Sequence, residues 1–139
     1  YDKLNLKDVM ILPKTGTLPD SRESLQLFFD TLYHSAAVIA VNTSGMIDAI
    51  IAWKPVVTIL PERYKDSQSE TQHFQYLLKN GVLETAKNPG EFLEVFKNIL
   101  AEHDAKKIQM ELFVKKYIRP HGLEKSAGEA AADEIEKLI

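Results

Sequence analysis

The sequence contains no cysteine among its 139 residues, and it contains no long hydrophobic run. The absence of cysteine excludes a disulfide framework and a metal site built on thiolates, and it fits a reducing compartment. No apolar run approaches the roughly 20 residues that a membrane-spanning helix needs, and the amino-terminal residues do not follow the pattern of a signal peptide. We therefore expect a cytoplasmic protein.

An excess of charge of either sign is also missing. The chain has 17 basic and 20 acidic residues, for a net charge of −3, and the lysines are spread rather than clustered. This balance gives no electrostatic footprint for a nucleic acid. The length is that of one domain, with enough residues to bury a core. The sequence begins at Tyr1 without a methionine, which fits a piece excised from a longer protein.

One stretch organises the rest of the chain. Residues 36–41 form a short apolar run rich in β-branched side chains, which is typical of a strand covered on both faces. A polar turn at residues 42–45 then opens a helix over residues 44–53, which is apolar on nearly every side and should be buried. Pro55 ends this helix, and a second apolar run follows at residues 56–60. The pattern predicts a right-handed βαβ unit with the polar turn at the carboxyl end of its first strand, where ligands bind in such sheets.

The remaining pattern alternates strands with helices. We expect a strand at 8–12 and then a helix opened by Asp20, with Glu23 as its capping-box partner. A helix at 69–80 follows the second central strand, with Gln72 as capping-box partner and Gly81 after its end, and a short outer strand follows at 82–86. The remaining elements are a helix capped by Asn88, a helix at 105–118 and a last helix opened by Ser126. The helix after Asp20 has an apolar face formed by Leu25, Phe28, Phe29 and Leu32.

This order predicts an α/β fold in one domain over residues 1–139. We expect a three-layer, Rossmann-like parallel sheet of three to four strands with extra C-terminal helices. A sheet this narrow leaves at least one edge without a partner strand. That shortage again fits a piece of a longer protein.

The polar turn carries the first candidate binding residues, Asn42, Thr43, Ser44 and Gly45. A helix amino terminus presents unpaired N–H groups, the hydroxyl groups of Thr43 and Ser44 add donors, and Gly45 lets the backbone approach an anion. Asp48 lies four residues after Ser44 on the same helix face, where its carboxylate could accept hydrogen bonds from a ribose diol. The same residues have an ordinary structural interpretation, in which Thr43 or Ser44 caps the helix and Asp48 stabilises its dipole.

Loops at the other strand ends would flank the same crevice. Pro13, Lys14 and Thr15 could offer backbone groups to a base edge, and Arg63 could pair with phosphate in a forked geometry. His73 begins a helix beside the crevice and is a candidate ligand contact. In the alternative interpretation, Pro13, Lys14, Thr15 and Arg63 lie in solvated surface loops, and His73 is a local hydrogen-bond donor.

Familiar catalytic patterns are missing. The four histidines are scattered without metal-ligand spacing, and no Walker, Gly-x-Gly-x-x-Gly or Gly-x-Ser-x-Gly motif is present. No general acid–base pair stands out. The sequence therefore predicts a binding site, and we assign no catalytic residue or metal ligand.

The segment NTSGMIDA at residues 42–49, followed by WKPVV at 53–57, resembles a recurring stretch in the carboxyl-terminal half of GT-B glycosyltransferases. It is most similar to bacterial polysaccharide and CDP-glycerol-type transferases, and more distantly to UDP-N-acetylglucosamine 2-epimerases. The segments LYHSAAV at 32–38 and TQHF at 71–74 are also similar to that group, so the resemblance covers about residues 9–100. The family usually has glutamate where this chain has Asp48, and glycine where it has Trp53.

The resemblance implies a nucleotide-sugar donor site, with Thr43, Ser44 and Gly45 at the diphosphate and Asp48 at the ribose hydroxyls. It implies a nucleotide-diphosphate sugar as substrate, transfer without a bound metal or other cofactor, and a role in polysaccharide or cell-envelope glycan synthesis. It also implies a missing amino-terminal acceptor domain, so that the isolated chain would be inactive and any peripheral membrane association would need the full-length enzyme. Two alternatives stay open: a flavodoxin-like interaction or regulatory domain that binds no nucleotide, and half of a nucleotide-sugar 2-epimerase.

Overall fold

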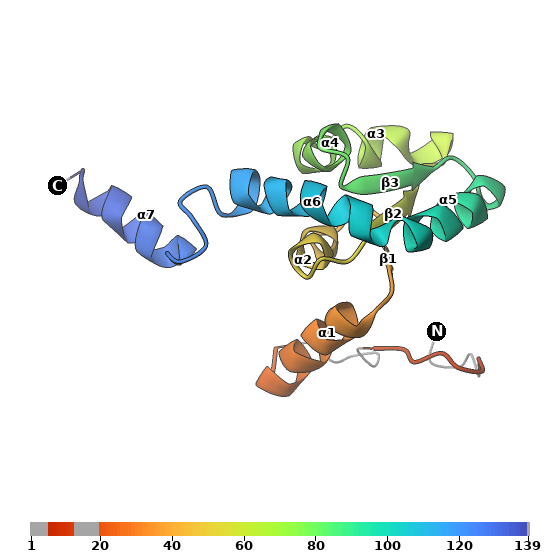
Figure 1. Ribbon diagram of the computed structural model, residues 1–139, viewed down its shortest axis with the longest axis horizontal. Coiled ribbons are helices and arrows are strands. Elements are labelled where there is room, and N and C mark those ends of the chain that lie inside the picture. The colour runs from red at the N-terminus through yellow and green to blue at the C-terminus, as the bar shows by residue number, and fades with distance from the viewer. Residues whose placement is uncertain (1–5, 13–19, 139) are drawn as a thin grey trace.

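The computed structural model describes residues 6–12 and 20–138 and has an α/β fold around a three-stranded parallel sheet (Figure 1). The strand order is β1 (Val38–Ile39), β2 (Val56–Ile59) and β3 (Leu83–Ala86). Val38 is in register with Val56, which is in register with Leu83. The predicted strand–helix–strand unit and the short outer strand are both confirmed, so the carboxyl ends of all three strands lie at one edge of the sheet.

Helices connect and follow the strands. Their bounds are α1 (Arg22–His34), α2 (Gly45–Ile51), the 3₁₀ turn η1 (Glu62–Tyr64), α3 (Lys65–Gln68), α4 (Gln72–Lys79), α5 (Pro89–Ala101), α6 (His103–Phe113), its π-helical continuation η2 (Val114–Ile118) and α7 (Ala127–Glu136). Among the described residues, none of these helices has both the length and the apolar character needed to cross a bilayer.

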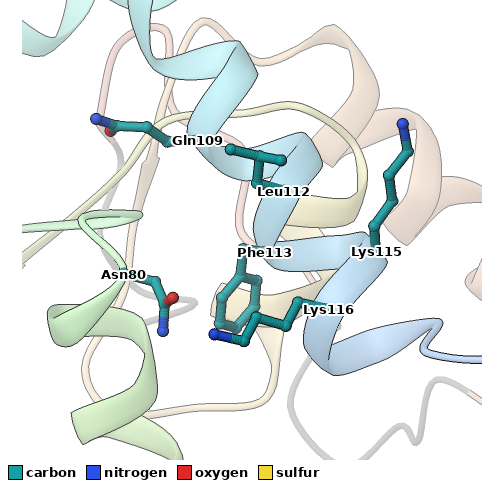
Figure 2. A pocket seen from close by; sticks show the side chains of 6 residues that line it. All are labelled: Asn80, Gln109, Leu112, Phe113, Lys115 and Lys116. Atoms are coloured by element: carbon teal, nitrogen blue, oxygen red, sulfur yellow. The ribbon is translucent and has the colours of Figure 1, made fainter.

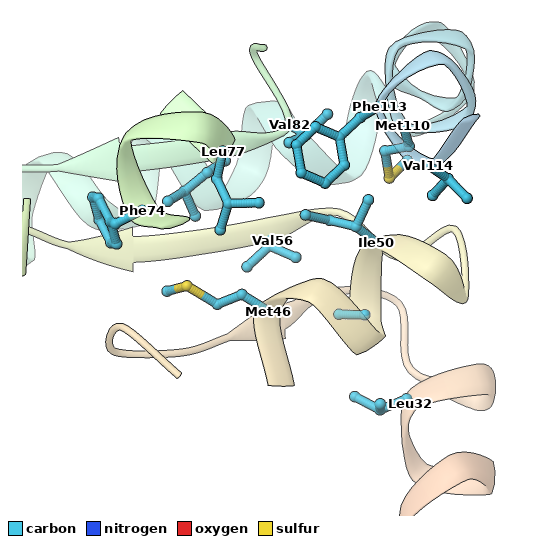
Figure 3. Close-up of a cluster of buried hydrophobic side chains, with 12 residues drawn as sticks. Leu32, Met46, Ile50, Val56, Phe74, Leu77, Val82, Met110, Phe113 and Val114 are labelled. Atoms are coloured by element: carbon cyan, nitrogen blue, oxygen red, sulfur yellow. The ribbon is translucent and has the colours of Figure 1, made fainter. Parts of the chain in front are cut away.

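The main core lies where α2, α4 and α6 meet β2 and β3 (Figure 3). Met46, Ala49 and Ile50 give α2 its buried side, as its apolar sequence predicts. The other buried members come from α1, β2, α4, β3 and the residue before it, α6 and the first residue of η2: Leu32, Val56, Phe74, Leu77, Val82, Leu83, Met110, Phe113 and Val114. Helix α5 contacts β2 and β3, and its Ile99 is buried outside this cluster. The core therefore fixes α2 against the strand whose carboxyl end borders the predicted site.

The predicted strand at residues 8–12 is wrong. Residues 7–8 form a turn, residues 9–12 have no regular structure, and the side chain of Met10 is 79% exposed. As a result, β1 is a two-residue strand at the edge of the sheet instead of a central one. An apolar, β-branched run is a local signal, whereas a strand forms only where a neighbour completes its hydrogen bonds.

Two predicted helix starts are also wrong. Helix α1 is capped by Ser21 instead of Asp20, because the Ser21 Oγ accepts the Ser24 N–H at 3.1 Å. The predicted helix at 69–80 begins later, at Gln72, because α3 ends at Gln68 and residues 69–71 form a turn between the two helices. Gln72 makes no capping box there, since its Nε2 donates to the Tyr76 hydroxyl at 2.9 Å. Ser, Thr and Asp at neighbouring positions compete for the same capping role, so the pattern alone does not select one.

Three other helix boundaries are confirmed. Gly81 follows α4 with a φ of +65°, the left-handed conformation in which glycine has no steric penalty. Asn88 caps α5 by accepting the Glu91 N–H at 3.0 Å. Ser126 and Glu129 form a reciprocal capping box at the start of α7. These boundaries depend on local chemistry: Asn88 and Ser126 accept a backbone N–H three residues later, and Gly81 supplies a conformation that glycine favours.

The apolar face of α1 is only partly covered. Leu32 is buried against the core, but Leu25, Phe28 and Phe29 are exposed, and the helix lies away from the sheet (Figure 1). Phe29 stacks on Tyr33 with ring centroids 5.6 Å apart. The predicted helix is therefore correct, while most of its predicted buried face is open to solvent in this chain.

Thr58 in β2 offers a test of the core. Its side chain is fully buried, and its hydroxyl has no hydrogen-bond partner within the described residues. Replacement by valine keeps the shape and removes the unpaired hydroxyl, so Thr58→Val is expected to raise the free energy of unfolding by about 1 kcal/mol in urea denaturation.

The matched control is Thr85→Val in β3. Thr85 is in register with Thr58 but is only half-buried, so the change there should stay within about 0.5 kcal/mol. A loss of stability in Thr58→Val would contradict the expectation, since it would mean that the buried hydroxyl forms a favourable hydrogen bond in the folded protein.

Candidate functional site

Asn42 forms the centre of the candidate site, three residues after the end of β1. Its backbone has a φ of +42°, a left-handed conformation that asparagine tolerates better than most residues. Its Nδ2 donates to the carbonyl oxygen of Ser67 at 3.1 Å. Its Oδ1 lies 2.7 Å from the His73 Nε2 and accepts a longer hydrogen bond of 3.4 Å from the Thr71 Oγ1.

These contacts fix the orientation of both side chains. Because the Ser67 carbonyl can only accept, the Asn42 nitrogen must face it, and the Asn42 oxygen must face His73. The oxygen in turn requires a proton on the His73 Nε2. In the neutral imidazole this leaves the Nδ1 of His73 as a hydrogen-bond acceptor.

The network joins the segments that follow two neighbouring strands. Asn42 follows β1, while Ser67, Thr71 and His73 come from the helical segment that follows β2. The prediction that the segment after β2 lies beside the turn is therefore confirmed. Two predicted site residues, Asn42 and His73, are in direct contact although 31 positions separate them.

The rest of the turn leads into α2, which begins at Gly45. Ser44 occupies the N-cap position, but its backbone is already helical and its side chain makes no capping hydrogen bond. The carbonyl oxygens of Thr43 and Ser44 accept the N–H groups of Met46 and Ile47 at 3.1 and 2.8 Å. A methyl group on Gly45 would lie 3.3 Å from the Thr43 Oγ1, a crowded distance, so glycine keeps this turn compact.

The side chains of Thr43, Ser44 and Asp48 are all exposed. Asp48 lies in the first turn of α2, the position from which an acidic side chain interacts favourably with the helix dipole. The hydroxyl groups and the carboxylate are thus accessible to solvent. The alternative in which Ser44 caps the helix through its side chain does not hold in this structure.

Arg63 follows β2 on η1 and is exposed, with its guanidinium carbon 5.4 Å from the centre of the neighbouring Tyr64 ring. Beside it, Lys65 forms an exposed ion pair with Glu62 at 3.6 Å. The structure thus places Arg63 on the segment that borders the turn, stacked on an aromatic ring. The other predicted residues, Pro13, Lys14 and Thr15, lie outside the described part of the chain.

Sequence reasoning missed Ser67, Gln68 and Thr71. Gln68 is 5% exposed, and its Nε2 donates to the carbonyl oxygen of Ile59, the last residue of β2, at 3.3 Å. A buried glutamine on a short polar helix therefore anchors α3 to the end of the strand. The signal available in the sequence was the row of side chains with hydrogen-bonding groups after β2, but nothing in it distinguished the buried members from the solvated ones.

Two cavities lie away from this turn. One, of about 480 Å³, lies between the end of α4 and the junction of α6 with η2 (Figure 2). The other, of about 160 Å³, lies between β3, α5 and α6 and includes the Glu84–Lys106 ion pair. Neither is lined by a residue of the turn. Both cavities therefore belong to elements other than the described part of the predicted site.

Comparison with known proteins adds no family to this description. No protein-family model, curated protein or solved structure matches the chain.

Proposed function

We propose that this chain is the donor-binding part of a GT-B glycosyltransferase that acts in polysaccharide or cell-envelope glycan synthesis. The observation that carries the proposal is that the Asn42 side chain joins the segments that follow two neighbouring parallel strands. In open α/β sheets, ligands bind outside the carboxyl ends of the strands. The exposed residues Thr43 and Ser44 follow Asn42 directly in the chain, and the exposed Asp48 lies in the first turn of α2.

In this proposal each polar group has one role. The turn at Thr43, Ser44 and Gly45 holds the diphosphate of a nucleotide sugar, and Asp48 accepts hydrogen bonds from the ribose. Arg63, which follows β2 at the same edge, pairs with a phosphate oxygen, and His73 holds Asn42 in place. The finer fold in the proposal is a three-layer, Rossmann-like domain, in which an amino-terminal domain completes the cleft.

Transfer then needs groups from both halves. The bond between the sugar C1 and the diphosphate oxygen breaks, and the diphosphate leaves with the electron pair. The acceptor hydroxyl forms the new bond to C1 and gives its proton to a base in the missing domain. The contribution of this chain is to stabilise the charge that develops on the leaving diphosphate.

The backbone at Trp53 supports the resemblance on which this proposal draws. Trp53 has a φ of +58°, although residues other than glycine rarely adopt this conformation. The related transferases usually have glycine at this position. The chain therefore retains, after α2, the backbone geometry that a glycine would favour, and it places a partly buried indole there.

A second candidate is an interaction domain that binds no nucleotide. The exposed aromatic and aliphatic face of α1 favours it, because large exposed apolar surfaces often mark contacts with other proteins. The two candidates differ in one measurable property, which is a response of the turn to nucleotide diphosphates.

Titration with UDP, CDP and GDP, followed by backbone amide chemical shifts, tests the proposal. We expect at least one of them to shift the amides of residues 42–48 and 73 and to saturate at millimolar concentration. Asp48→Ala is expected to weaken this binding roughly tenfold or more, because hydrogen bonds to a charged group contribute about 1.5–3 kcal/mol. Asp48→Glu, which keeps the carboxylate, is expected to retain binding.

The control is Asp133→Ala on α7, which removes the same charge far along the chain and should leave nucleotide affinity unchanged. The absence of any response to all three nucleotides would reject the donor site and favour the interaction domain. A transferase and a 2-epimerase half share the expected response, and the full-length protein separates them by whether release of free nucleotide requires an acceptor.

A further inference from the structure

Helix α4 ends at the one asparagine in the sequence that precedes a glycine, in the pair Asn80-Gly81. An asparagine can lose its side-chain amide when the backbone nitrogen of the next residue attacks the carboxamide carbon. Glycine favours this attack, because it has no Cβ to hinder the approach of its nitrogen. Asn88 precedes a proline, which has no N–H, and Asn98 precedes an isoleucine, whose branched side chain crowds its own nitrogen. The sequence thus makes Asn80 more reactive than either of these.

The attacking nitrogen is part of the helix end. The Gly81 N–H donates to the Leu78 carbonyl at 3.0 Å, and the Val82 N–H donates to the Leu77 carbonyl at 3.2 Å. This pair of hydrogen bonds is a Schellman motif, which ends a helix at a residue with positive φ, here +65° at Gly81. The Gly81 nitrogen can therefore reach the Asn80 side chain only after the last turn of α4 has opened, and helix ends are among the regions that open most easily.

The Asn80 carboxamide is held at the same place but is not sealed from water. Its Nδ2 donates to the Tyr76 carbonyl at 2.8 Å. Hydrogen bonding by this side chain also lowers the pKa of the Tyr117 phenol below its ordinary value. Asn80 is only half-buried and lines the cavity of about 480 Å³ at the end of α4 (Figure 2). Water can therefore reach the carboxamide from the cavity.

We propose that Asn80 is a site of spontaneous deamidation, with water as the co-reactant, and that opening of the last turn of α4 limits its rate. This inference is independent of the donor site, because its residues belong to α4 and to the link between α4 and β3. It predicts a slow covalent change at a defined joint of the fold.

The reaction proceeds in two steps. The Gly81 nitrogen forms a bond to the Asn80 Cγ, the bond between Cγ and Nδ2 breaks, and Nδ2 leaves as ammonia with the proton of the Gly81 nitrogen. The product is a cyclic imide. Water then adds to one of its two carbonyl carbons, and the bond from that carbon to the Gly81 nitrogen breaks and restores the N–H. Opening at Cγ gives aspartate, and opening at the backbone carbonyl carbon of residue 80 gives isoaspartate.

Both products weaken the joint between α4 and β3. Each replaces the Nδ2 donor with an oxygen that faces the Tyr76 carbonyl, and each adds a negative charge at a helix carboxyl terminus, where it is unfavourable. Isoaspartate also adds the Cβ of residue 80 to the backbone, directly before Gly81. Leu77 and Val82, on either side of this point, both belong to the buried core cluster. We therefore expect isoaspartate to destabilise the chain more than aspartate does.

Peptide mapping by mass spectrometry tests the proposal, after incubation of the chain in buffer and in concentrated urea. Replacement of the side-chain NH₂ by OH changes the mass of the peptide, and chromatography separates isoaspartate from aspartate. We expect Asn80 to be modified before Asn88 and Asn98 in both conditions. Folding is expected to slow the reaction at Asn80 about tenfold to a hundredfold, the equivalent of the two hydrogen bonds that must break at Gly81 and at Asn80.

Variants at Lys79 test the requirement for opening. Lys79 is an exposed residue in the last turn of α4. Lys79→Gly is expected to speed the reaction at Asn80 about fivefold in the folded chain, because glycine is less favourable than alanine in a helix. Lys79→Ala removes the same side chain and is the matched control, with no increase in rate expected. In urea the two variants should react at the same rate, because the helix is absent.

The consequence is measured by urea denaturation of the separated products. The isoaspartate form is expected to unfold at lower urea concentration than the Asn80→Asp variant, which reproduces the aspartate form. The proposal is overturned if Asn80 in the folded chain is modified no faster than Asn98. It is equally overturned if folding leaves the rate at Asn80 unchanged, or if Lys79→Gly and Lys79→Ala react alike in buffer.

Discussion

Replacing Phe74 with alanine is expected to lower the free energy of unfolding by about 3–5 kcal/mol. The Phe74 side chain on α4 is fully buried and belongs to the main core cluster (Figure 3). Alanine would remove the ring and leave a cavity that the neighbouring elements can fill only in part. Typical domains have a stability of about 5–15 kcal/mol, so this one change removes a large part of it.

Urea denaturation followed by circular dichroism measures the effect. An unchanged dependence of the unfolding free energy on urea concentration (the m-value) would show that the surface exposed on unfolding is the same in the variant. Phe28→Ala is the matched control, because the Phe28 ring on α1 is 46% exposed and should cost less than about 1 kcal/mol. If the first variant is too unstable to study, Phe74→Leu keeps most of the volume and should show a smaller loss in the same direction. Equal effects at residues 28 and 74 would contradict the placement of α4 over the sheet.

Replacing Met110 with alanine is expected to cost about 2–5 kcal/mol in the same measurement. The Met110 side chain on α6 is 1% exposed, and α6 contacts α2. The loss reports whether this late helix is part of the cooperative core instead of an appendage. A detached α6 would give a different result, namely reduced helical signal without a shift in the main unfolding transition.

Ile108→Ala is the control for that variant. Ile108 lies two residues earlier on the same helix and is 66% exposed, so its replacement should change the free energy of unfolding by no more than about 0.5 kcal/mol. A large loss at residue 108 together with a small one at residue 110 would mean that α6 is rotated about its axis relative to the described packing.

Local chemistry explains which parts of the fold could be predicted. Gly81, Asn88 and Ser126 were assigned correctly because each satisfies a backbone group within four residues, or supplies a conformation that glycine favours. The strand expected at residues 8–12 failed because strand formation depends on a neighbour elsewhere in the chain. The apolar pattern of α1 correctly predicted a helix but could not show how much of its face would be covered.

The candidate site was predictable in outline only. Parallel strands place their carboxyl ends together, so the approach of the segment after β2 to the turn after β1 followed from topology. The pairing of Asn42 with His73, Ser67 and Thr71 did not follow, because it depends on where η1 and α3 place the chain between β2 and α4. The burial of Gln68 escaped prediction for the same reason.

The use of both ends of the Asn42 carboxamide makes this residue hard to replace. Aspartate has nearly the same shape, but it would set a negatively charged oxygen against the Ser67 carbonyl, where the amide nitrogen now donates. Spontaneous deamidation of Asn42 would therefore remove the hydrogen bond to Ser67, and it would also add a negative charge that repels an approaching anion. None of the residues in this contact belongs to the buried core cluster, so we expect the loss of the contact to leave the fold intact.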